Sequence, residues 1–105
     1  MKKIKFNTLC QHEGKKYLGF AEGYLIECAG REVGISKSSF GYWTATDLAA
    51  GLAFPVDEFF EKRKDLVDWL ASKEDYFKKQ FRKKKIKDRF AECARILNEL
   101  KESVK

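Results

Sequence analysis

The sequence is poor in proline, methionine and histidine, with one of each, and it contains no long apolar run. A single proline, together with 44% hydrophobic residues, argues against a disordered chain. A membrane-spanning helix would need ~20 consecutive apolar residues, and no segment provides them. The Met-Lys-Lys start resembles the basic end of a signal peptide, but Lys5, Asn7 and Gln11 interrupt the apolar run that should follow. We therefore expect one folded, cytoplasmic domain over residues 1–105, with no membrane association.

Cysteine and histidine are too few for a disulfide framework or a four-ligand zinc site. The three cysteines, Cys10, Cys28 and Cys93, are odd in number and widely spaced, and no CxxC pair occurs. Cys10 and His12 would share one face of a strand, so with Cys28 they leave a three-ligand zinc site or a Cys–His nucleophile pair as alternatives. We interpret Cys10 as a core residue and His12 as a hairpin residue, and expect neither metal nor cofactor.

Enzyme motifs are also missing. The glycines of residues 1–54 match neither a phosphate-binding loop nor a dinucleotide-binding fingerprint. No spacing selects a catalytic pair among the acidic residues Glu22, Glu27, Glu32 and Asp47. Scattered surface acids explain them, and we expect no enzymatic activity.

Residues 1–54 form short runs of alternating apolar and polar side chains interrupted by glycines. The first run places Ile4 and Phe6 on one face and Lys3 and Lys5 on the other, as in a half-buried strand. The further runs cover residues 17–22, 24–29, 33–37, 42–46 and 52–54, with a bulge or a strand boundary at Gly23. Turns are expected at residues 12–15, 30–32 and 47–51. Such short connections predict an α+β fold that starts with an antiparallel β-meander of four or five short strands.

Two C-terminal helices are predicted after Pro55, over residues 57–71 and 73–103, the last one long and basic. Asp57 is expected to cap the first helix. The apolar stripe of this helix comprises Phe59, Phe60, Leu66, Val67 and Leu70. Ser72 begins a segment that resembles a capping box, which predicts the start of the second helix.

The second predicted helix carries an apolar seam in its C-terminal part, with residues spaced alternately by four and three. The seam residues are Ile86, Phe90, Cys93, Leu97, Leu100 and Val104. Phe77 and Phe81 project from nearly the opposite side, so the helix is expected to kink near residues 82–85 or to stand clear of the sheet there. We expect the seam to pack against the chain's own sheet or first helix. A homodimer through Ile86–Val104 is the alternative.

Positive charge is concentrated in residues 78–89, which carry a net charge of +7 in a chain whose total is +6. The basic residues are Lys78, Lys79, Arg82, Lys83, Lys84, Lys85, Lys87 and Arg89. Like charges this close repel each other in a helix, and phosphates that neutralise them would release counterions. The patch therefore predicts a polyanionic partner. The alternatives are a solvated helix face, or a localisation signal with Lys62-Arg63-Lys64 as a second cluster.

We accordingly expect a small non-enzymatic protein that binds nucleic acid through phosphate-backbone contacts with little sequence specificity. No motif indicates whether the partner is DNA or RNA. Tyr17, Tyr24 and Tyr42 are candidate base-stacking residues, although aromatic side chains more often fill a core. The alternative is a protein-interaction module, an accessory or inhibitor protein of the kind that phages and mobile elements encode. Its basic helix would dock on an acidic protein or on a second copy.

Overall fold

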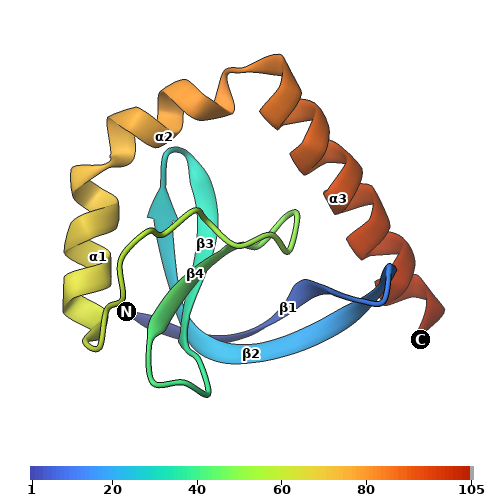
Figure 1. Ribbon diagram of the computed structural model, residues 1–105, viewed down its shortest axis with the longest axis horizontal. Coiled ribbons are helices and arrows are strands. Elements are labelled where there is room, and N and C mark those ends of the chain that lie inside the picture. The colour runs from blue at the N-terminus through green and yellow to red at the C-terminus, as the bar shows by residue number, and fades with distance from the viewer. Residues whose placement is uncertain (105) are drawn as a thin grey trace.

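The computed structural model describes residues 1–104, and within them an antiparallel sheet of four strands is followed by three helices (Figure 1). The strands are β1 (Lys2–His12), β2 (Lys15–Cys28), β3 (Arg31–Lys37) and β4 (Trp43–Asp47). The helices are α1 (Arg63–Ser72), α2 (Glu74–Phe81) and α3 (Lys84–Ser103). Each strand pairs with the next in the order β1-β2-β3-β4, which confirms the predicted α+β class and its N-terminal meander. None of the helices in this part of the chain is both long and apolar enough to cross a bilayer.

Two-residue turns set the register of the first three strands. His12 pairs with Lys15 across Glu13-Gly14, whose φ angles are 50° and 79°. Cys28 pairs with Arg31 across Ala29-Gly30, whose φ angles are 55° and 76°. Two successive positive φ angles are typical of the type I′ turn, whose twist matches that of the flanking strands. The second turn therefore lies one residue earlier than the sequence predicts.

Strand β2 continues through Gly23, where the sequence predicts a bulge or a boundary. A Cβ atom on Gly23 would lie 1.8 Å from the carbonyl oxygen of Ile35 in β3, so only glycine fits at this close approach of two backbones. Pairing between β2 and β3 begins at the next residue, Tyr24. Gly23 thus marks the point beyond which β2 pairs with β3, while its pairing with β1 extends to Leu25.

Residues 51–54 connect the two edges of the sheet. The amide of Phe54 donates to the carbonyl of Ala45 in β4 over 2.9 Å, and Ala53 forms an isolated bridge with Thr46. On the other edge, the amide of Leu9 in β1 donates to the carbonyl of Gly51, also over 2.9 Å. The predicted strand over 52–54 is therefore a short bridge after a turn, and it holds β1 near β4.

The helices cover two separate parts of the sheet. Helices α1 and α2 pack on β2, β3 and β4 around a core of Cys28, Val33, Ile35, Ala45, Phe54, Leu66, Leu70 and Phe77. Helix α3 packs against the end of the β1–β2 hairpin with Cys93 and Leu97 buried, as expected for packing of the seam against the chain's own sheet (Figure 1). The centre of the seam is therefore buried within the chain. Burying one leucine side chain stabilises a fold by about 1.5–3 kcal/mol.

Helix α1 begins at Arg63, later than the predicted residue 57. The preceding segment runs beside β4, where the amide of Trp43 donates to the carbonyl of Phe60 over 2.8 Å. That pairing keeps the backbone out of the helix, and Lys62, without a side-chain cap, takes the N-cap position predicted for Asp57. Phe59, predicted to face the core, is 80% exposed.

The predicted second helix is divided into α2 and α3. Lys83 separates them with an extended backbone (φ −71°, ψ 131°), at the place where the sequence predicts a kink. The predicted cap at Ser72 is wrong, because its hydroxyl donates to the carbonyl of Trp69 in α1 and Lys73 is the N-cap of α2. The break allows Phe81 of α2 and Phe90 of α3 to meet with ring centroids 5.1 Å apart, which a continuous helix would prevent.

Candidate nucleic-acid interface

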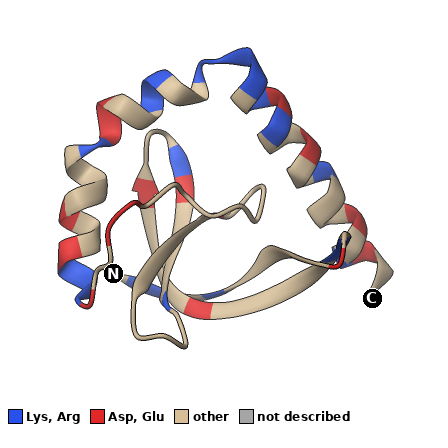
Figure 2. Cartoon of the chain, viewed as in Figure 1, with Lys and Arg blue, Asp and Glu red and all other residues tan. Residues whose placement is uncertain are grey.

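The junction of α2 and α3 gathers the positive charge of the chain into one corner of the molecule. We call the following residues the basic corner: Lys78, Lys79, Arg82, Lys83, Lys84, Lys85, Lys87 and Arg89. All eight side chains are exposed, and they come from the end of α2, the break and the first turns of α3. In Figure 2 the blue segments cluster where the two helices meet. The break thus turns a linear run of basic residues into a surface on two helices.

The charge of the basic corner is not compensated by neighbouring carboxylates. Within residues 1–104, no carboxylate lies within 4.0 Å of any of its eight cationic groups. The nearby carboxylate of Glu74 is engaged elsewhere, because it accepts a hydrogen bond from the amide of Ala29 over 3.2 Å. Helix α3 has no acidic residue in its first turn, where the helix dipole favours negative charge. An external anion would relieve both the repulsion and the unfavourable dipole contact.

The distal part of α3 differs, because its charges neutralise one another. The guanidinium of Arg95 pairs with Glu92 and, over 2.5 Å, with Glu99. Hydrogen bonds from Arg95 lower the pKa of Glu92, whereas the two carboxylates raise the pKa of Arg95. The cluster of basic residues on α3 therefore lies in its first turns, and a single further lysine, Lys101, lies in the last turn.

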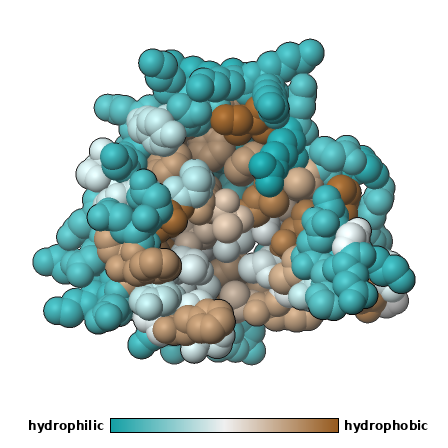
Figure 3. Space-filling view, in the orientation of Figure 1, coloured by the Kyte–Doolittle hydropathy of each residue, from teal (hydrophilic) through white to brown (hydrophobic). Residues whose placement is uncertain are grey.

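An apolar groove lies beside the basic corner, between α2, α3 and the segment that follows β4. We call it the aromatic groove; its volume is about 460 Å³, within the range of small-molecule sites, roughly 300–1,000 Å³. Its helical side is formed by Tyr76, Phe77, Gln80, Phe81, Ile86, Arg89 and Phe90. Its other side is formed by Leu9, Leu52, Ala53 and Pro55. Figure 3 shows tan and brown surface in the middle of this face, framed by hydrophilic side chains.

Two polar side chains in the aromatic groove are available for a ligand. The hydroxyl of Tyr76 and the amide of Gln80 have no hydrogen-bond partner among the described residues. Tyr76 is 53% exposed, and its ring also meets Phe77 edge-on with ring centroids 5.5 Å apart. Arg89 belongs to both the groove and the basic corner. The groove therefore combines flat aromatic surfaces, free hydrogen-bonding groups and an adjacent cation.

Arg31 contacts two of the aromatic rings that line the aromatic groove, those of Phe81 and Phe90. Its guanidinium carbon lies 5.2 Å from the ring centroid of Phe81 and 5.1 Å from that of Phe90, within the range of cation–π contact. The same guanidinium binds the buried carboxylate of Asp47 through two hydrogen bonds of 2.6 and 2.9 Å. The amide of Ala50 donates a third, over 3.0 Å, to this carboxylate. Hydrogen bonding to Asp47 raises the pKa of Arg31, so the cation that holds the two rings together is permanent.

Sequence reasoning did not identify Arg31, Asp47, Tyr76 or Gln80 as parts of a site. Arg31 was predicted only as a turn residue, and Asp47 as one of several surface acids. The two lie on different strands, and their pairing depends on the register that sets Val33 opposite Asp47. In the sequence, the signal for Asp47 was its position directly before the apolar segment 48–50.

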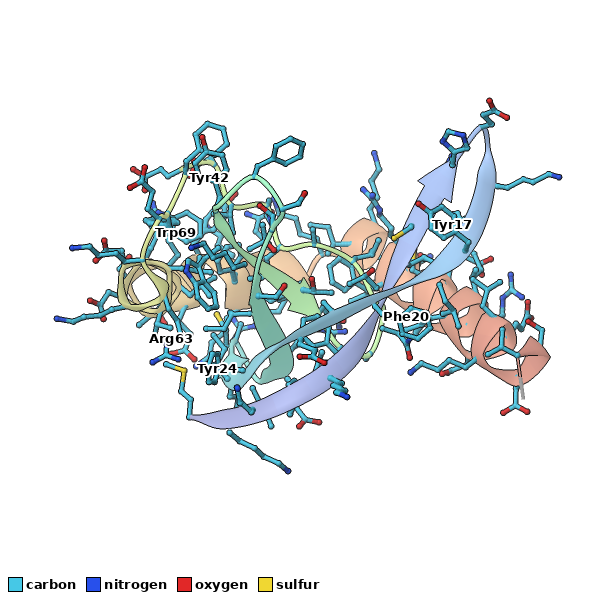
Figure 4. All side chains as sticks on the ribbon, turned by 90° about the horizontal axis from the view of Figure 1, so that it is seen from below. Tyr17, Phe20, Tyr24, Tyr42, Arg63 and Trp69 are labelled. Carbon is cyan, nitrogen blue, oxygen red and sulfur yellow. The ribbon has the colours of Figure 1, made fainter. Side chains whose placement is uncertain are left out.

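The three tyrosines predicted to stack on bases lie apart from one another and outside the aromatic groove. Figure 4 places Tyr17 on the β1–β2 hairpin, and Tyr24 and Tyr42 at the other end of the sheet. Arg63 covers the ring of Tyr24 at 4.2 Å, and Phe59 packs on Tyr42 with ring centroids 4.7 Å apart. Their rings are thus engaged with neighbours, whereas Tyr17 is 49% exposed.

The cysteines and histidine do not assemble into a site. Cys10 and His12 lie near the tip of the β1–β2 hairpin, whereas Cys28 ends β2. Among the described residues, no three His, Cys, Asp or Glu side chains come together in a way that could hold a metal ion. Burial, with a smaller contribution from Glu74, raises the pKa of the Cys28 thiol, which keeps it protonated and unreactive at neutral pH.

Fold and site together define a small α+β domain with a basic helical corner next to an aromatic groove. No protein-family model matches the chain, and neither does any curated protein or solved structure. The functional argument therefore rests on the geometry and charge of this chain.

Proposed function

We propose that this protein is a small non-enzymatic nucleic-acid-binding protein that contacts the phosphate backbone through its basic corner. One observation carries the proposal: eight exposed cations lie together on α2, the break and α3 without a carboxylate partner in the described chain. Holding these charges together costs repulsion energy in the free protein. Phosphates remove that cost and release counterions when they bind.

Backbone contacts of this kind carry little sequence information. The basic corner consists mainly of lysines, which bind phosphate as point charges, with arginine only at positions 82 and 89. Base reading in a duplex usually needs arginine or amide side chains aligned on one recognition helix. Binding should therefore depend strongly on salt and weakly on the order of bases.

The test is binding of fluorescent DNA and RNA oligonucleotides at several salt concentrations, measured by anisotropy. If all eight cations contact phosphates of a single strand, the logarithm of the association constant should fall with the logarithm of salt with a slope of roughly −5 to −6. Replacing Lys83, Lys84 and Lys85 by glutamate should abolish binding while leaving the circular dichroism spectrum unchanged.

The matched control reverses three exposed lysines outside the basic corner, Lys37, Lys62 and Lys64, also to glutamate. Both triple variants change the net charge by the same amount. The control variant should lose little affinity, because long-range attraction is screened beyond about 10 Å at 0.1 M salt. Equal losses in the two variants, or binding that does not respond to salt, would refute the proposal.

A protein-interaction module is the second candidate, and the aromatic groove is the observation that favours it. An acidic protein segment with an apolar anchor would place its anchor in the groove and its carboxylates near Arg89 and Lys85. This candidate predicts capture of an acidic protein and no oligonucleotide binding at low salt. Dimerisation through Ile86–Val104 has less surface available, because Cys93 and Leu97 are buried within one chain.

A further inference from the structure

The aromatic groove contains features that phosphate binding leaves unused. A phosphate-binding surface needs cations, but it does not need an open tyrosine ring, a free amide and a hollow of about 460 Å³. The ring of Tyr76 and the amide of Gln80 lie one helical turn apart on α2, next to the cation of Arg89 on α3. Their position beside the basic corner means that a chain of phosphates bound there would run along the mouth of the groove.

Building on the proposed function, we propose that the ligand is single-stranded nucleic acid and that the aromatic groove receives an unpaired base. The base stacks against the exposed part of the Tyr76 ring. The amide of Gln80, which both donates and accepts hydrogen bonds, meets the edge of the base. Arg89 holds the adjacent phosphate, while the lysines of the basic corner follow the backbone on either side.

The groove favours a single strand over a duplex. In a duplex the base faces are stacked on one another, so an aromatic groove gains nothing from it unless a base is first extruded, which costs a few kcal/mol. An unpaired base offers its face without that cost, and stacking on an aromatic side chain contributes about 1–3 kcal/mol per base. Every base has such a face, so this contact adds preference for single strands without strong preference for sequence.

A second hollow extends the path of the strand. It has a volume of about 250 Å³ and shares Leu9, Leu52 and Arg89 with the aromatic groove. It continues between β1, β2 and α3 to Gln11 and Lys16, and its α3 side includes Glu92, whose carboxylate pairs with Arg95. Arg89 therefore stands between two adjoining hollows, where one phosphate could be held with a nucleotide on each side.

The experiment compares three labelled probes of about twelve nucleotides, a length within the usual site sizes of single-strand binders. The probes are an oligothymidine strand, a duplex and an abasic strand with the same sugar-phosphate backbone. Wild-type protein should bind oligothymidine about tenfold more tightly than the abasic strand, which matches about 1.4 kcal/mol of stacking. The duplex should bind more weakly than oligothymidine at the same salt concentration.

Tyr76→Leu should remove the preference for oligothymidine and leave abasic binding unchanged, and Tyr76→Phe should retain most of the preference. Phe40→Leu is the matched control, because Phe40 is also an exposed aromatic residue but lies between β3 and β4, outside both hollows. Ala53→Trp, which fills the groove from its other side, should act like Tyr76→Leu. Circular dichroism and thermal unfolding confirm that each variant is folded.

The outcomes separate this inference from the proposed function. Equal binding of oligothymidine and abasic strands, or a Tyr76→Leu variant that keeps the preference, overturns base insertion and leaves phosphate binding in place. Failure of all three probes to bind overturns both. In that case the acidic protein partner becomes the explanation of the basic corner and the groove.

Discussion

The ion pair between Arg31 and Asp47 predicts a large loss of stability when the arginine is replaced. Asp47 is 1% exposed, and two of its three hydrogen bonds come from the Arg31 guanidinium. Arg31→Met keeps an unbranched side chain beneath Phe81 and Phe90 but removes the charge. The carboxylate of Asp47 is then left buried with a single donor, the amide of Ala50.

The size of the effect follows from the desolvation of Asp47. Breaking a buried ion pair from one side costs about 3–5 kcal/mol. The lower end applies here, because the side chain of Arg31 is 30% exposed and Ala50 still donates to Asp47. Loss of two cation–π contacts adds about 0.5–1 kcal/mol each. The free energy of unfolding should therefore fall by about 4 kcal/mol, a large part of the roughly 5–15 kcal/mol that stabilises most domains.

Urea unfolding monitored by circular dichroism measures this change. The slope of the free energy of unfolding against urea concentration should be the same as in wild type. Asp47→Asn should cost less than Arg31→Met, because the partly exposed guanidinium can hydrate once its partner is gone. The Arg31→Met variant should also lose base preference, because Phe81 and Phe90 are no longer held together.

Arg95→Met is the matched control. Arg95 also donates two hydrogen bonds to one carboxylate, that of Glu92, and a third to that of Glu99. All three side chains are more than half exposed. Exposed pairs contribute little to stability, so this variant should unfold close to wild type. If Arg31→Met costs no more than Arg95→Met, or if Asp47→Asn costs more than Arg31→Met, the reasoning about the buried carboxylate is wrong.

Two further predictions concern the helix break and Cys28. Lys84→Pro should be close to neutral relative to Lys84→Ala in thermal unfolding, because proline suits the first position of α3 after the extended Lys83; a loss near 3 kcal/mol would indicate a continuous helix. The pKa of the Cys28 thiol is raised in the folded state. The buried, protonated thiol therefore makes its full contribution to stability below the thiol pKa of the unfolded chain, about 8.5. That contribution is lost as the pH rises above this value. Wild type should therefore lose more stability than Cys28→Ala between pH 8 and pH 10 in urea unfolding, and parallel profiles would contradict the assignment.

Local patterns predicted much of the fold because they act over a few residues. Alternation of side chains and two-residue turns define the β-meander, and the turn at Glu13-Gly14 lies where the sequence places it. The opposed positions of Phe81 and Ile86 in a helix predicted a break or a detour near Lys83, and the chain breaks there. The position of the basic corner follows from the same local pattern.

Helix starts were less predictable, because distant partners compete with local preference. Asp57 and Phe59 have the sequence of a helical first turn, but the backbone that follows pairs with Trp43 of β4 instead. Phe59 then packs on Tyr42 at the surface, although helical periodicity places it in the core. A hydrogen bond to another strand outweighs a cap that contributes about 1 kcal/mol.

The sequence by itself determined the α+β class, the order of elements and the concentration of charge at residues 78–89, since each depends on neighbours along the chain. Only the tertiary structure decided what lies beside that charge. The register of β3 and β4 pairs Arg31 with Asp47, and the break at Lys83 brings Phe81 against Phe90. These contacts bring β1, the segment after β4, α2 and α3 together around the aromatic groove. No local pattern in the sequence encodes the distances between such elements.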